Sequence, residues 1–537
     1  MKKRMIMKKH IKLILSLVVI AAISTSCLKD LDTIPIDPDQ VTSAQVFDDP
    51  ASYKQILAKL YAGLAVSGQT GPAGNADISG IDEGFGQYLR GLWYHQEFTT
   101  DEAVISWNDQ TIKDFHWQSW GTTDVFVAAF YYRIFYQISA VNEYIRETVE
   151  GKLDDRGVSG QLRTDIGYFR AEARWLRALS YWHAMDHFGN VPFVTEQDAV
   201  GAFFPKQINR ADLFTYIEDE LKTIEPLMVD ARANEYARAD KAAVWMLLAK
   251  LYLNAEVYTG AERDSDCVTY CKKIIDAGFS LETDYSNLFL ADNDLARDEV
   301  IFPVAFDGAF TKTWGGTTFI IHAGVGGDMV PADYGIDGGW GGTRTTSALV
   351  GKFDDSSGET DKRAMFFTEG QNLEIEDIGL FTDGYAITKF KNIDRVGNAG
   401  SDLTFPDTDF PMFRLADVYL MYAEATLRGG QGGNLGMALE YVNYVRKRAY
   451  GGSNDGEINA NELTLDFILD ERARELYWEG HRRTDLVRFS KFTGGVYLWP
   501  WKGKLQDGRA TDTKYELFPI PDSDINANPN LVQNPGY

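Results

Sequence analysis

Long stretches of helical periodicity constrain the fold of this chain more than any other feature. In ADKAAVWMLLAKLYLNAEVYTG, the apolar residues Val244, Leu247, Leu248, Leu251 and Ala255 recur at steps of three and four. This spacing places all five on one face of an α-helix, so the segment is expected to bury that face against a partner.

The same periodicity recurs in segments that lie far apart in the chain. We expect helices at Asp165–His187, Ala211–Met228, Asp266–Ala277, Leu415–Gly430, Gly436–Ala449 and Leu465–Glu479. Consecutive helices of this kind resemble tetratricopeptide hairpins, but their irregular spacing argues against a continuous solenoid. The expected fold class is therefore mainly α, with tetratricopeptide-like helix pairs forming a scaffold.

Two regions, at about 67–110 and 284–411, lack this periodicity and are rich in glycine, aspartate and aromatic residues. The helical scaffold would then cover about 40–60, 120–280 and 410–492. Loops on a rigid scaffold often carry binding residues, so we expect the ligand site on these irregular loops and their short strands.

The N-terminus has the features of an export signal. Six basic residues precede an apolar run at 13–23, which is short for a membrane span, and Ser24-Thr25-Ser26-Cys27 follows. We interpret 1–26 as a lipoprotein signal peptide and 27–537 as a single domain that acylated Cys27 anchors to a membrane. The alternative is an ordinary signal peptide with a chance cysteine.

The charge of the chain excludes one large class of partners. Without the six basic residues of the signal, 47 basic residues remain against 78 acidic ones, a formal charge of −31. Such a surface repels phosphate backbones, so no nucleic-acid partner is expected. Cys267 and Cys271 have no neighbouring His or Cys cluster, and we expect packing or a local bridge rather than a zinc site.

Three long motifs resemble those of the SusD/RagB family. They are FRAEARWLRALSYWHAMDHFGNVPFV (169–194), DERARELYWEGHRRTDLVRFSKF (470–492) and FPIPDSDINANPNLVQNPGY (518–537). The resemblance runs from Cys27 to the C-terminus and is most detailed to the family's starch-binding type. It implies a cell-surface glycan-binding lipoprotein of the outer membrane, with four tetratricopeptide-like pairs and no catalysis or required cofactor. It also implies a partner, a SusC-like TonB-dependent transporter.

The resemblance also implies the site residues. Six positions match the glycan site of the starch-binding type: the aromatic residues Trp107, Trp314 and Trp340, and the polar residues Asp82, Arg90 and Gln110. Flat aromatic rings suit the apolar faces of sugar rings, and polar groups suit the hydroxyl rim. An arc of such rings suits a curved α-glucan or a maltooligosaccharide. Trp314 replaces a tyrosine of that type, and Gln110 replaces an asparagine.

Core packing is the alternative for each tryptophan, since most tryptophans of a large protein lie in the core. For Trp340 we favour binding, because four glycines flank it in DYGIDGGWGG. For Trp107 and Trp314 the assignment depends on the resemblance. We expect Trp93 and Tyr334 to be packing residues.

Two acidic segments offer oxygen ligands of the kind that calcium prefers. Asp294 lies in Asp-Asn-Asp, and Asp407 and Asp409 form Asp-Thr-Asp, although neither segment is a complete EF-hand loop. The alternatives are solvated acidic pairs or a structural calcium that bridges the two segments. His481 is expected to make a structural hydrogen bond with Asp485 or a nearby backbone group.

Two other function classes stay open at the level of sequence. A surface glycoside hydrolase would need two carboxylates roughly 5–10 Å apart, and Asp82, Glu83, Asp101 and Glu102 lie in the first loop region. A protein-interaction scaffold would use its helical hairpins to bind peptides. A binder of a different glycan with the same transporter role is a third alternative.

Overall fold

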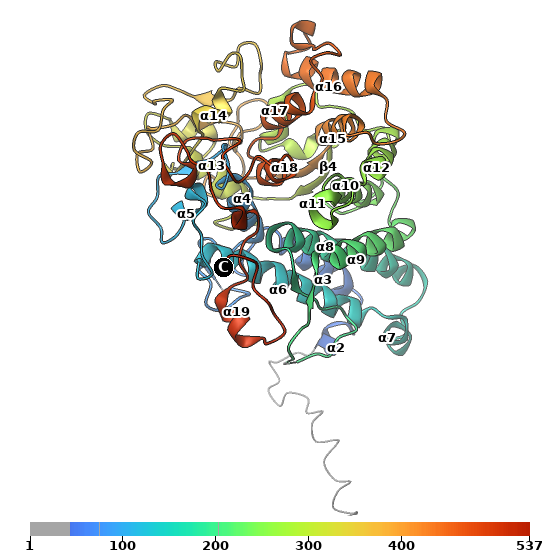
Figure 1. Cartoon of the computed structure of the whole chain (residues 1–537). Coiled ribbons are helices and arrows are strands. Elements are labelled where there is room, and N and C mark those ends of the chain that lie inside the picture. Colours follow the sequence, from blue (N-terminus) through green and yellow to red (C-terminus); the bar gives the residue numbers. More distant parts are fainter. Residues whose placement is uncertain (1–42, 75, 202) are drawn as a thin grey trace, which may run out of the picture. The chain divides into compact units, whose positions relative to one another are not determined.

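The structure, a computed structural model, describes residues 43–74, 76–201 and 203–537 (Figure 1). The described residues divide into two units, one that ends at Tyr53 and one from Lys54 to Tyr537. The expected signal peptide at 1–26 and the expected lipidation site Cys27 lie outside the described residues. No helix in the described part of the chain is long and apolar enough to cross a membrane.

Helices dominate the described residues. Up to residue 276 they are α2 (Ser43–Val46), α3 (Ser52–Ala62), α4 (Tyr88–Glu97), α5 (Lys113–Trp117), α6 (Val125–Glu147), α7 (Glu150–Asp155), α8 (Gly160–Phe188), α9 (Arg210–Ile224), α10 (Lys241–Leu253), α11 (Ala255–Thr259) and α12 (Asp264–Asp276). Beyond it they are α13 (Gly316–Gly324), α14 (Ser347–Val350), α15 (Leu415–Leu427), α16 (Leu435–Ala449), α17 (Leu465–Leu476), α18 (Arg482–Arg488) and α19 (Asp522–Ala527). The expected mainly α fold class is confirmed.

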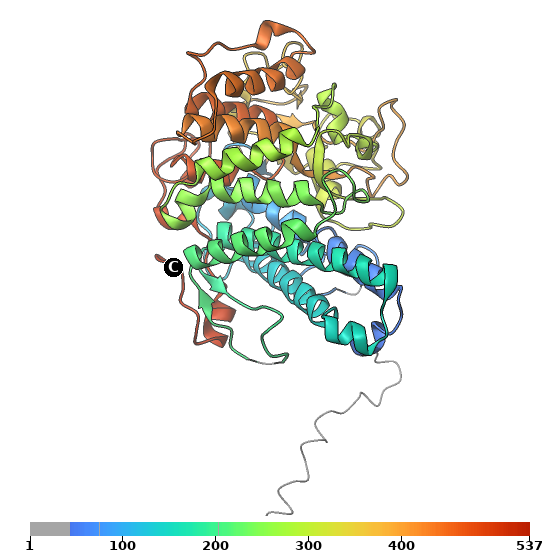
Figure 2. The same ribbon diagram turned by 90° about the vertical axis from the view of Figure 1, so that its right-hand side faces the viewer.

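The long helices pack in pairs, as the periodicity predicts. α6 lies along α8 and α8 along α9, while α10 contacts α12, α12 contacts α15, and α15 contacts α16. Figure 2 shows α6 and α8 running side by side. Aspartates begin two of these helices: Asp124 and Asp240 each accept hydrogen bonds from two backbone N–H groups of the first turn.

Short antiparallel strand pairs lie between the helices. They are β1 (Val104–Ile105) with β5 (Thr343–Arg344), β2 (Val191–Pro192) with β3 (Gln207–Ile208), β4 (Val300–Val304) with β8 (Phe410–Arg414), and β6 (Phe366–Phe367) with β7 (Ala386–Ile387). The β4–β8 pair leads directly into α15, so this strand joins the second loop region to the scaffold.

Three helices lie inside the expected loop regions: α4, α13 and the short α14. Every residue of α4 and of α13 is buried, so neither helix has a polar face that would give the periodicity of a surface helix. Two polar side chains of α4 bond within the helix instead. Arg90 Nε donates to Tyr94 Oη (2.8 Å), and His95 Nδ1 donates to the Gly91 carbonyl (2.7 Å).

The charged motif around 470–488 lies in the interior rather than on the surface. Arg414 contacts Glu299 (3.0 Å), Glu475 (2.5 Å) and Glu479 (2.6 Å), and all four side chains are at most 1% exposed. Arg482 holds Asp101 through two hydrogen bonds of 2.7 Å. These buried ion pairs connect α17 to β8 through Arg414, and α18 to Asp101, just before β1. The chain on both sides of Asp101 carries residues of the candidate site.

A buried acid pair lies beside this network. Glu97 Oε1 accepts a hydrogen bond from the Gly480 N–H (2.6 Å), and Glu102 Oε2 accepts one from the Trp478 N–H (3.2 Å). Burial raises the pKa of Glu97 to about 7. Burial, together with the charge of Glu97, holds the pKa of Glu102 well above its ordinary value. The pair therefore keeps a proton at pH values where exposed glutamates have lost theirs.

This acid pair predicts a pH effect on stability. Because the folded pair binds a proton more tightly than the unfolded chain, its contribution is complete below pH 4.5 and is lost as the pH rises through about 7. We expect Glu102→Gln to gain about 1–3 kcal/mol in free energy of unfolding relative to the wild type between pH 5 and 8. Urea unfolding across that range measures the difference; parallel curves for the two proteins would refute the assignment.

Two smaller expectations are now settled. Cys267 and Cys271 are buried free thiols with sulfurs 3.9 Å apart, so they pack and do not form the local bridge. The side chain of His481 contacts Lys250, with Nδ1 and Nζ 3.2 Å apart, whereas its expected partner Asp485 binds Arg472 and Arg488.

Candidate functional site

A cavity of about 350 Å³ opens between the two loop regions. Its walls are formed by Asp82, Gly84, Phe85, Arg90, Tyr94, Trp107, Asp109, Gln110, Ile112, Phe126, Trp314 and Trp340. All six residues that the sequence resemblance selects are among them. The structure thus brings together residues that are up to 258 positions apart in the chain.

The pairing of β1 with β5 joins the two loop regions at this cavity. Ile105 lies opposite Thr343, and just beyond it the Ser106 N–H donates to the Gly342 carbonyl (2.9 Å). Trp107 therefore lies beside the glycine-rich loop, and its Nε1 donates to the carbonyl of Trp340 (3.2 Å).

The C-terminal end of α13 holds the Trp340 loop. The N–H of Trp340 donates to the carbonyl of His322 (2.7 Å). The N–H of Gly341 donates to the carbonyl of Val325, which follows α13, and the N–H of Gly342 donates to the carbonyl of Ala323 in α13. Gly341 has a φ of +55°, which other residues rarely adopt. A Cβ on Gly342 would lie 2.7 Å from the indole of Trp107. Glycine here lets the backbone approach α13 and Trp107 closely.

The three tryptophans form a bent row. The ring centroids of Trp107 and Trp340 are 6.3 Å apart with planes at 43°, and those of Trp340 and Trp314 are 6.1 Å apart at 61°. All three are half-buried, unlike core tryptophans such as Trp93, which is 1% exposed. All three expose part of their surface at the cavity, as a binding role requires. Trp93 and Tyr334 are buried, as expected.

The polar residues of the cavity have different environments. Arg90 is buried and donates to the carbonyls of Gly84 and Trp314 (2.7 Å for the latter). It therefore connects two segments of the cavity wall. Asp82 is exposed, and its Oδ1 accepts from the Gly84 N–H (2.7 Å). Gln110 is also exposed and has a φ of +36°, a strained backbone that often marks functional sites.

Sequence reasoning missed several residues of the wall, among them Asp109, Phe85 and Tyr94. Asp109 lies between Trp107 and Gln110 in WNDQ, so its position beside two candidates was the available signal. Phe85 and Tyr94 had no comparable signal. Chemically, half-buried rings and polar groups at one opening can bind a ligand that has apolar faces and a polar rim.

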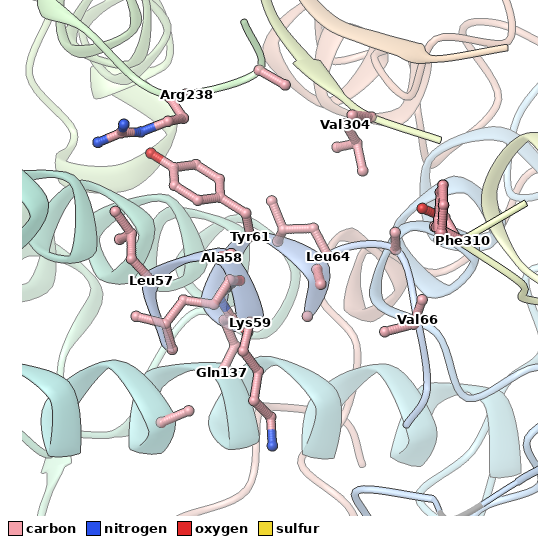
Figure 3. Close-up of a pocket in the computed structure, with 18 of the residues that line it drawn as sticks. Leu57, Ala58, Lys59, Tyr61, Leu64, Val66, Gln137, Arg238, Val304 and Phe310 are labelled. Atoms are coloured by element: carbon pink, nitrogen blue, oxygen red, sulfur yellow. Dashed lines mark hydrogen bonds between the residues drawn. The ribbon is translucent and has the colours of Figure 1, made fainter. Parts of the chain in front are cut away.

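A second cavity, of about 620 Å³, lies away from these residues (Figure 3). Its walls are largely apolar, with Leu57, Leu64 and Val304 among them. Its central polar groups already have partners, because Tyr61 Oη and Arg238 both donate to Glu172. None of the six residues that the resemblance selects lines this cavity, and we assign the candidate site to the smaller one.

The expected calcium ligands do not fit a metal site. Asp407 accepts from the N–H of Gly308 and from Ser401, and Asp409 accepts from the N–H of Phe306 (2.7 Å) and from Tyr236 Oη. Burial raises the pKa of Asp409 to about 7. Within the described residues, no group of three or more His, Cys, Asp or Glu residues is arranged to hold a metal ion.

The two acidic segments are instead joined directly. Asn293 Nδ2 donates to the Asp409 carbonyl (2.9 Å), and the Asp409 N–H donates back to Asn293 Oδ1 (3.0 Å). Asp294 faces the exposed Arg297 at 3.8 Å. We therefore expect a calcium chelator to leave the thermal midpoint of the purified chain unchanged. A fall of several degrees that added calcium reverses would restore the calcium hypothesis.

Comparisons with known proteins identify the family. The sequence profile of the SusD family matches residues 359–537. The chain is 36% identical to the starch-binding protein SusD of Bacteroides thetaiotaomicron, covering 98% of this chain and 99% of that protein. It is 25% identical to SusD-like protein P25 of Formosa agariphila, covering 76% and 78% of the two chains. The chain belongs to the SusD family.

Solved structures show the same fold. A SusD superfamily protein of Parabacteroides distasonis has a TM-score of 0.68 at 24% identity, covering 93% of this chain and all of that one. Surface glycan-binding protein A of Bacteroides thetaiotaomicron, solved with laminarihexaose, has a TM-score of 0.66 at 20% identity, covering 90% and 99%. The helical scaffold described above is therefore the scaffold of this superfamily.

Proposed function

We propose that this chain is a non-catalytic binder of starch or other α-glucans, including maltooligosaccharides. The observation that carries the proposal is the bent row of Trp107, Trp340 and Trp314 around one cavity, with Asp82 and Gln110 exposed beside it. The chain's similarity along almost its whole length to a starch-binding protein supports the same ligand class.

The bend of the row favours a curved ligand. Adjacent indole planes are inclined by 43° and 61°, so successive sugar rings can stack on them only if the chain turns between rings. An α-glucan turns in this way, whereas a flat chain such as cellulose would contact fewer rings. An open site of this kind suits an affinity of about micromolar to millimolar, from which the ligand can later be released.

The carboxylates of the first loop region argue for binding rather than hydrolysis. Asp101 is bound to Arg482 and Glu102 belongs to the buried acid pair, so neither is free to act on a substrate. Asp82 and Asp109 remain at the cavity. We expect no release of reducing ends from a maltooligosaccharide that the chain binds. Hydrolysis that Asp82→Asn or Asp109→Asn abolishes would establish the hydrolase alternative.

The proposal also includes a cellular location and a protein partner for the chain. Acylated Cys27 would hold it at the outer membrane, on the cell surface, and a SusC-like TonB-dependent transporter would receive the bound glycan. Family membership supports both statements.

A further inference from the structure

The ring of His322 stacks on one face of Trp340, the central tryptophan of the row. His322 is at the C-terminal end of α13 with its side chain buried, and the two ring centroids lie 4.8 Å apart with planes at 21°. Its carbonyl also accepts the hydrogen bond from the Trp340 N–H. One residue therefore touches both the backbone and the ring of Trp340.

The two ring nitrogens of His322 face two backbone carbonyls. Nδ1 is 2.6 Å from the oxygen of Gly338, and Nε2 is 2.9 Å from the oxygen of Thr404. A carbonyl oxygen can only accept, whereas a neutral imidazole carries a single N–H. Both contacts are hydrogen bonds only if both ring nitrogens carry a proton, which makes the ring a cation.

The charged groups next to these carbonyls suit a cation. Asp337 precedes Gly338 and accepts from Thr404 Oγ1, and Asp402 accepts from the Thr404 N–H (2.8 Å). Lys312 lies 3.5 Å from Asp402 and offsets part of that charge. A cation stacked on an indole face is attracted by the ring's quadrupole, and more strongly where water is excluded.

We propose that His322 is the positioning residue of the glycan site: as a doubly protonated ring it fixes the indole of Trp340 from below and leaves the other face for a sugar. This inference deepens the proposed function and depends on it for the ligand. The contacts to Gly338 and Thr404 also connect the Trp340 loop to the segment around Thr404, so the position of Trp340 is set before the ligand arrives.

His116 provides an internal comparison. Its ring is equally buried, but Nδ1 faces the Phe98 carbonyl (3.0 Å) whereas Nε2 accepts from the Ile105 N–H (3.0 Å). A neutral ring satisfies both contacts. With nitrogen-15-labelled histidine in the soluble chain, we expect two proton-bearing ring nitrogens at His322 and one at His116. A single proton-bearing nitrogen at His322 would overturn the proposal, with or without a ligand.

The second test replaces the ring. His322→Phe keeps a flat ring beneath Trp340 and loses both N–H groups, and we expect about tenfold weaker binding of a maltooligosaccharide of seven units. His183→Phe is the control, because His183 is a buried histidine outside the cavity whose ring contacts Tyr88 Oη (2.9 Å). It should change stability without changing affinity. Equal affinity of His322→Phe and the wild type would overturn the positioning role.

A ligand-free measurement separates this inference from the proposed function. The indole N–H signal of Trp340, assigned by its loss in Trp340→Phe, should move in His322→Phe and stay in place in His183→Phe. An unmoved signal in His322→Phe would overturn the positioning role. If the wild type bound no maltooligosaccharide, the α-glucan proposal would fail, and the ring-nitrogen and indole signals would still decide the role of His322.

Discussion

Replacing Trp340 with alanine is expected to weaken binding of a maltooligosaccharide of about seven units by about 30- to 700-fold. Trp340 is the middle residue of the row, and its ring centroid lies 6.3 Å from that of Trp107 and 6.1 Å from that of Trp314. Its removal leaves two indole rings that no longer form a continuous surface. Loss of a central aromatic contact typically costs about 2–4 kcal/mol, and 1.4 kcal/mol is tenfold in affinity. Calorimetric titration of the chain lacking residues 1–27 measures the loss of affinity.

Trp245→Ala is the matched control for this experiment. Trp245 is also half-buried, but it lies on α10 of the scaffold and its Nε1 donates to Glu225 Oε1 (2.7 Å). The control should bind the ligand as the wild type does. If Trp340→Ala also bound with unchanged affinity, the cavity would not be the glycan site, and a protein-interaction role would become the better hypothesis.

The second large effect concerns stability. We expect Arg414→Met to lower the free energy of unfolding by about 3–5 kcal/mol, because it leaves Glu299, Glu475 and Glu479 buried with less compensating charge. Breaking a buried ion pair costs more than the pair itself contributes, since the remaining charges cannot reach water. Denaturant unfolding followed by circular dichroism measures the change.

Arg297→Ala is the control for the stability experiment. Arg297 is 61% exposed and faces Asp294 at 3.8 Å, and exposed pairs of this kind contribute between zero and about 1 kcal/mol. A loss at Arg414 no larger than the loss at Arg297 would show that the interior network does not hold α17 to β8.

The sequence predicted the scaffold well and the buried helices poorly, for one physical reason. A helix such as α16 packs mainly on α15 and carries its apolar residues at regular steps. α4 and α13 are short and buried along their whole length, so they lack the exposed polar face that marks a surface helix in a sequence. The loop boundaries at 67–110 and 284–411 therefore contain helices that position the site.

The site itself was predicted only as a set of residues. The resemblance named six side chains, and the structure places all six on one cavity wall. The sequence could not show that carbonyls of α13 hold the glycines around Trp340, because that contact joins positions that no local pattern relates. Likewise, the alternating oxygens of Asp407 and Asp409 look the same whether a metal or N–H groups satisfy them.

The most direct test of the account is a titration of the soluble chain, lacking residues 1–27, with two oligosaccharides of equal length, one α-1,4-linked and one β-1,4-linked. The bent row of tryptophans predicts micromolar to millimolar affinity for the α-linked chain and much weaker binding of the flat β-linked one. Equal or stronger binding of the β-linked chain, or no binding of either, would contradict the α-glucan assignment and move the ligand to a different glycan.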